Sequence, residues 1–178
     1  SGSNLNTTSN GSSITVTGSQ GAVNGQTARS STQVVWTPLQ LETDGSNDDI
    51  YTITVTPIDM FGRSGTPRIQ KQIFDTQEPE IISITVIDLN QPVSYLSVPI
   101  SQIAMQIQDL GPAELKIGSQ QIELQNESGK PILATVTNDG SEWIFLTLNQ
   151  PLVTNGSDDG NYTVVINLID KVGNKKQV

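Results

Sequence analysis

The chain has 178 residues, of which 18 are acidic and 9 are basic, and its formal net charge of −9 disfavours nucleic acid and anionic lipid as partners because both would repel it. It contains no cysteine and no histidine, which excludes disulfides, thiolate metal sites and the usual Ser-His or Cys-His catalytic pairs. This length accommodates one large β domain or two domains of about a hundred residues each.

Short runs with period-two alternation of apolar and polar residues follow one another along the chain. In residues 51–56, for example, Tyr51, Ile53 and Val55 fall on one face and threonines on the other. Each run is bounded by turn-forming residues, and nothing of length indicates a helix. The predicted strands, in chain order, are 13–18, 33–39, 51–56, 66–74, 81–89, 101–110, 121–126, 132–137, 142–148 and 162–168. Many short strands predict an all-β fold of sandwiches.

Residues 41–62 are repeated at 152–173. With a constant offset of 111 residues, 10 of the 22 aligned positions are identical, which is well beyond chance. The match continues loosely upstream, where Trp36 can be placed against Phe145 and residues 13–18 against 121–126. A period of this length suits a complete small domain repeated in tandem.

The boundary between the two copies is predicted in residues 74–83, where Pro79 favours a short, stiff hinge. We therefore predict two domains, residues 1–77 and 78–178. The second copy has two strands, 81–89 and 101–110, before the strand that matches 13–18 of the first. We accordingly expect the first domain to lack its early strands and the second to stop within its last strand.

Three motifs resemble the bacterial immunoglobulin-like repeats of large exported surface and adhesion proteins. They are a G-S-x-D-x-x-Y-T strand entry at 45–52 and 156–163, an I-D-x-x-G ending at 58–62 and 169–173, and a D-T-x-x-P junction at 75–79. Tyr51 and Tyr162 also resemble the tyrosine corner of immunoglobulin folds, although Ile53 and Val164 stand where antibody domains have cysteine. The resemblance implies tandem immunoglobulin-like β-sandwiches, the first incomplete.

The resemblance also implies a structural function. Such repeats would act as a spacer, for example an adhesin stalk, in a bacterial multi-domain protein at the cell surface or secreted, with neighbouring repeats as partners. The alternative is a ligand-binding module for glycan or host protein, for which Trp143 and Tyr95 are the least clearly assigned aromatic residues. A third interpretation is that the first domain accepts a strand from another chain. We expect no enzyme activity and no membrane insertion within these residues.

Two candidate calcium sites follow from the acidic residues. The loops at Asp44–Asp48 and Asn155–Asp159 present oxygens at alternate positions, but plain turn chemistry is the favoured interpretation because no bidentate glutamate follows. The second candidate is the domain junction, where Asp59, Asp75 and Glu78 are expected to converge, and where related adhesin repeats use calcium. The alternative is that these are ordinary solvated surface acids.

Overall fold

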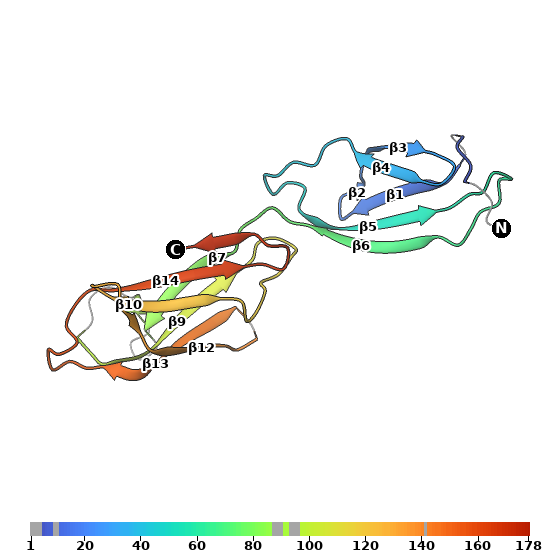
Figure 1. Cartoon of the computed structure of the whole chain (residues 1–178). Coiled ribbons are helices and arrows are strands. Elements are labelled where there is room, and N and C mark those ends of the chain that lie inside the picture. The colour runs from blue at the N-terminus through green and yellow to red at the C-terminus, as the bar shows by residue number, and fades with distance from the viewer. Residues whose placement is uncertain (1–4, 9–10, 87–90, 93–96, 141) are drawn as a thin grey trace. The chain divides into compact units, whose positions relative to one another are not determined.

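The computed structural model describes residues 5–8, 11–86, 91–92, 97–140 and 142–178 (Figure 1). The chain divides into two compact units, Ser1–Thr76 and Gln77–Val178. All regular elements in the described residues are β-strands, which confirms the predicted all-β class. No helix long and apolar enough to cross a membrane occurs in that part of the chain.

The second unit is a sandwich-like pair of antiparallel sheets. One sheet has the order β11-β10-β14-β15, and its strands are Pro131–Ile132, Gln121–Asn126, Tyr162–Ile169 and Lys175–Gln177. The other has the order β12-β13-β9-β7-β8, and its strands are Ala134–Asn138, Trp143–Leu152, Ile100–Gln108, Glu80–Val86 and Gln91–Pro92. Figure 1 shows the two sheets as facing layers.

The hydrophobic core of the second unit lies between these sheets. Alternate residues of each strand point inward, so that β9 contributes Ile103, Met105 and Ile107. The other members of the core are Ile122, Leu124, Ile144, Leu146, Leu148, Ile166 and Leu168. Strand β9 is the central strand of its sheet, and its inward side chains form part of this core.

The first unit contains one complete sheet and one strand pair. Its four-stranded sheet has the order β2-β1-β5-β6, with strands Gly21–Ala22, Ser13–Gly18, Asp49–Thr56 and Arg68–Phe74. Opposite it, the described residues of this unit form only β3, Gly25–Arg29, and β4, Val34–Pro38. Among its described apolar side chains, only Val16 and Tyr51 are buried.

The strands of the first unit have counterparts in the second. The order β2-β1-β5-β6 matches β11-β10-β14-β15, and the β3–β4 ladder of five pairs matches the β12–β13 ladder. In the described part of the first unit, no strand corresponds to β7 or β9. When the two ladders are compared pair by pair, Trp36 is equivalent to Leu146 and not to Phe145. The Phe145 side chain is half-buried on the other face of β13.

Most predicted strands are confirmed, and those at 13–18 and 121–126 have the predicted bounds. Strand β3 was missed because its sequence, Gly-Gln-Thr-Ala-Arg, has no alternation of apolar residues. Residues 87–89 of the predicted strand 81–89 lie outside the described residues.

Candidate functional site

Both units contain the same tyrosine hydrogen bond. The Tyr51 hydroxyl donates to the carbonyl oxygen of Asn47 at 2.6 Å, and the Tyr162 hydroxyl donates to that of Asp158 at 2.8 Å. Burial raises the pKa of both phenols above the usual value, and nearby aspartates add to this shift. The predicted tyrosine corners are therefore present, and each fixes the loop that enters its strand.

The acidic loops before these tyrosines are held by their own side chains. Asp44 Oδ1 accepts the backbone N–H and the hydroxyl of Ser46, at 3.0 and 2.5 Å. Asn155 Oδ1 accepts the same two groups of Ser157, at 3.0 and 2.7 Å. These bonds lower the pKa of Asp44. Such Asx turns are ordinary turn chemistry, the interpretation favoured from the sequence.

Asp59 and Asp170 organise equivalent turns. Asp59 Oδ1 accepts the backbone N–H groups of Phe61 and Arg63, each at 2.9 Å, and Oδ2 pairs with the Arg63 guanidinium at 2.7 Å. The backbone N–H of Arg63 is the main cause that lowers the pKa of Asp59. The Asp59 carboxylate therefore already has a cationic partner in its own turn.

In the second unit the corresponding turn has no arginine. Asp170 Oδ1 accepts the backbone N–H groups of Val172, Gly173 and Asn174 at 2.9, 2.5 and 2.9 Å, and Oδ2 accepts the Asn174 amide at 2.7 Å. Asp170 is almost fully buried, with 1% of its surface exposed. A neutral amide thus occupies the place that a guanidinium has in the first unit.

The structure does not bring together Asp59 and Asp75, two of the three predicted calcium ligands. Asp59 lies three residues beyond Thr56, the last residue of β5, whereas Asp75 follows Phe74, which pairs with Asp49, the first residue of β5. Asp59 and Asp75 therefore lie at opposite ends of this strand, which spans about 25 Å. Glu78 forms an ion pair with Lys176 at 3.3 Å. The expectation that Asp59 converges with Asp75 is wrong, because Asp59 lies in the turn between β5 and β6, whereas Asp75 follows the end of β6 at the other end of this hairpin.

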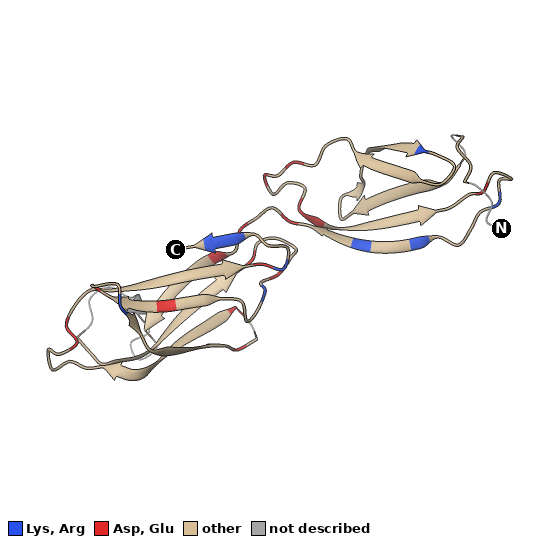
Figure 2. Ribbon diagram, viewed as in Figure 1, with Lys and Arg blue, Asp and Glu red and all other residues tan. Residues whose placement is uncertain are grey.

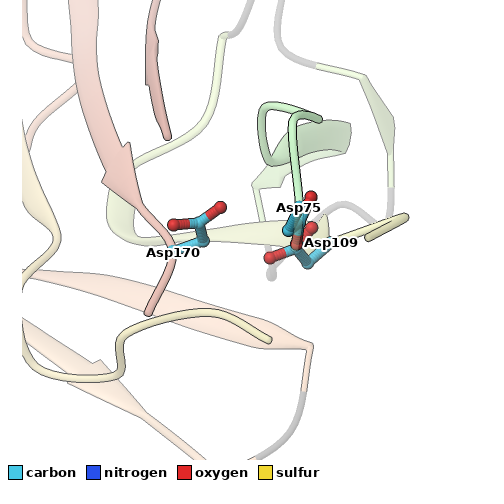
Figure 3. A group of neighbouring side chains, drawn as sticks. All are labelled: Asp75, Asp109 and Asp170. Atoms are coloured by element: carbon cyan, nitrogen blue, oxygen red, sulfur yellow. The ribbon is translucent and has the colours of Figure 1, made fainter. Parts of the chain in front are cut away.

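Figure 3 shows the side chains of Asp75, Asp109 and Asp170, of which Asp109 and Asp170 both belong to the second unit and form an acidic pair there. A carboxylate oxygen of Asp109 lies within 4.8 Å of a carboxylate oxygen of Asp170. Asp75 is in the segment that leads into β7, Asp109 follows β9, and Asp170 follows β14. Asp75 and Asp170 are buried and Asp109 is half-buried.

This pair has donor chemistry that suits a hard divalent cation. Calcium takes oxygen ligands at about 2.3–2.6 Å, and the negative charge of two neighbouring carboxylates is offset by such a cation. Asp170 Oδ2 accepts one hydrogen bond, which leaves this oxygen further lone-pair capacity. The sequence contained a signal for Asp170, which is the repeat equivalent of Asp59, but none that joined Asp109 to it.

The charged residues are distributed unevenly over the strands, as Figure 2 shows. The equivalent edge strands β6 and β15 each carry two basic residues, Arg68 and Lys71 on β6 and Lys175 and Lys176 on β15. Charges on an edge strand oppose pairing with a further strand. Strand β4 carries no charged residue.

The aromatic residues proposed for glycan binding are only partly described. Trp143 is half-buried, and Tyr95 lies outside the described residues. Tyr51 is buried, and Trp36, Phe145 and Tyr162 are half-buried. Comparison with protein-family models, curated proteins and solved structures found no match to this chain.

Proposed function

We propose that the two units are immunoglobulin-like repeats that act as a spacer in a bacterial cell-surface or secreted protein, such as an adhesin stalk. The observation that carries this proposal is the repetition of one construction, with equivalent strand orders and the tyrosine bonds of Tyr51 and Tyr162. A spacer needs a unit that can be repeated, and its partners are neighbouring repeats. The proposal assigns no catalysis to the chain.

The spacer proposal is tested by pulling on single molecules of the chain held between marker domains. We expect a discrete unfolding event for residues 77–178, with a gain in contour length on the order of 35 nm from about 3.5 Å per residue. Gradual extension without such an event would contradict the spacer function.

The rival proposal is a ligand-binding module for glycan or host protein. Trp143 supports this rival proposal, because its side chain is half-buried and is not part of the buried core. Saturable binding to a glycan array that is lost on Trp143→Ala, and retained by the control Phe145→Leu, would favour this function over the spacer.

We also propose that calcium binds at Asp109 and Asp170 of the second unit. The support is the approach of these two carboxylates and the absence of an arginine from the turn of Asp170, in contrast to that of Asp59. In calorimetry, calcium should bind the whole chain at submillimolar concentration, and Asp109→Asn should weaken binding at least tenfold. The control Asp44→Asn should bind as the unaltered chain does. No heat of binding at millimolar calcium would refute this proposal.

A further inference from the structure

The outer edge of β4 in the first unit has a well-defined counterpart in the second. The β3–β4 ladder runs from Gly25↔Pro38 to Arg29↔Val34, and the β12–β13 ladder runs from Ala134↔Leu148 to Asn138↔Ile144. Both contain five pairs, and in both the inward side chains alternate with outward ones. Residues 34, 36 and 38 therefore correspond to 144, 146 and 148.

In the second unit this edge is covered by β9. Ile144 is paired with Met105, Leu146 with Ile103, and Thr147 with Gln102. The Gln102 amide also donates to the Thr147 hydroxyl at 2.6 Å on the outer face. All four of the apolar side chains in these pairs are at most 2% exposed.

In the described part of the first unit, no strand pairs with the corresponding edge of β4. Val34 and Trp36 point inward but are only half-buried, in contrast to the burial of Ile144 and Leu146. The Trp36 indole lies on the backbone of Gly25, so the ring leans across β3 and away from the open edge. The edge of β4 that faces away from β3 thus has no strand partner among the described residues, and the inward side chains Val34 and Trp36 keep part of their surface exposed.

We propose that β4 is an acceptor site for an extended segment with the chemistry of β9. This segment pairs antiparallel to β4 and places apolar side chains against Val34 and Trp36. A glutamine at the position of Gln102 would reach Thr37, the counterpart of Thr147. The β9 sequence, Ile-Ser-Gln-Ile-Ala-Met-Gln-Ile-Gln, has no charge, and neither does β4.

The distribution of charge in the first unit favours addition of a strand at the edge of β4 over addition at the edge of β6. Strand β6 at the edge of the four-stranded sheet carries Arg68 and Lys71, which discourage pairing, whereas β4 carries no charged residue. Main-chain hydrogen bonds would supply affinity, and the alternate side chains of the segment would supply specificity. This proposal goes beyond the spacer function and does not depend on it.

The test uses the full chain and a synthetic peptide with the sequence of residues 98–109. In the variant Trp143→Phe the only remaining tryptophan is Trp36. The peptide should shift the Trp36 emission to the blue in a saturable manner. A peptide with Ile103→Ser, Met105→Ser and Ile107→Ser should bind at least tenfold more weakly, while one with Ala104→Ser and Gln106→Thr should bind within about threefold of the original.

Amide hydrogen exchange of the unaltered chain locates the bound peptide. We expect protection of residues 34–37 to rise at least tenfold on peptide addition. No emission shift at millimolar peptide, equal binding of the triple-serine peptide, or protection confined to the second unit would overturn the proposal. A light-scattering mass of two chains without peptide, together with protection of β4, would also overturn it in favour of pairing between copies.

Discussion

The hydroxyl of Tyr162 donates a 2.8 Å hydrogen bond to the carbonyl oxygen of Asp158, four residues earlier in the chain. Tyr51 makes the same bond to Asn47 in the first unit. The loop side chains below also correspond, since Asp158 Oδ2 accepts the N–H of Val153 at 2.8 Å and Asn47 Oδ1 accepts that of Glu42 at 2.7 Å. Two aligned residues of different type thus brace the loops in the same way.

Replacing Tyr162 by phenylalanine should destabilise the second unit. The ring keeps its packing, but the carbonyl of Asp158 loses its donor, which costs about 1 kcal/mol in the free energy of unfolding. Urea denaturation of Tyr162→Phe measures this cost. The exposed neighbour provides a control, because Thr163→Ser should change the unfolding free energy by less than about 0.5 kcal/mol. Equal values for the two variants would mean that the bond contributes nothing to stability.

Replacing Asp170 by alanine should have a larger effect on stability. The change leaves three backbone N–H groups and the Asn174 amide without their acceptor in a nearly fully buried place, which costs about 3 kcal/mol or more. Thermal unfolding followed by circular dichroism reports the loss. The matched variant Asp59→Ala should be milder, because that turn is more exposed. A smaller loss for Asp170→Ala than for Asp59→Ala would contradict the importance of burial.

Gly25 should not tolerate a side chain. A Cβ atom at this position would overlap the indole of Trp36, so Gly25→Ala must displace the ring. We expect a cost of about 1–3 kcal/mol in the unfolding of the first unit. Gly160→Ala is the control, because nothing lies within 4 Å of a Cβ there. Unchanged Trp36 emission in Gly25→Ala, measured with Trp143→Phe, would show that the ring is not seated on the glycine.

Acid should weaken the first unit through Asp49. Its Oδ2 accepts the backbone N–H of Ser19 at 2.5 Å, and this bond lowers the pKa of Asp49. Because the folded pKa lies below the unfolded value of about 3.9, the contribution to stability is present above that pH. It is lost as the pH falls through the folded pKa. Melting temperatures between pH 6 and pH 2.5 should therefore fall less steeply for Asp49→Asn than for the unaltered chain.

The wrong expectation that Asp59 converges with Asp75 shows where reasoning from the sequence alone reached its limit. The repeat identified Asp59 and Asp170 as equivalent, and the turn motif was correct for both. The repeat did not show at which end of the first unit the Asp59 turn lies, because this depends on how β5 and β6 pair. Asp109 was missed because it meets Asp170 only where β9 and β14, strands of different sheets, end side by side.

Features that depend on near neighbours in the chain are legible in the sequence. Alternation identified most strands, and the Asx turns and tyrosine bonds join residues only two to four positions apart, so local chemistry suffices for them. The order of strands, the approach of Asp109 to Asp170, and the open edge of β4 depend on tertiary pairing. These relationships depend on which sheet each strand joins. The alternation of apolar and polar residues does not reveal this, because the pattern of a strand is the same whichever strand it pairs with.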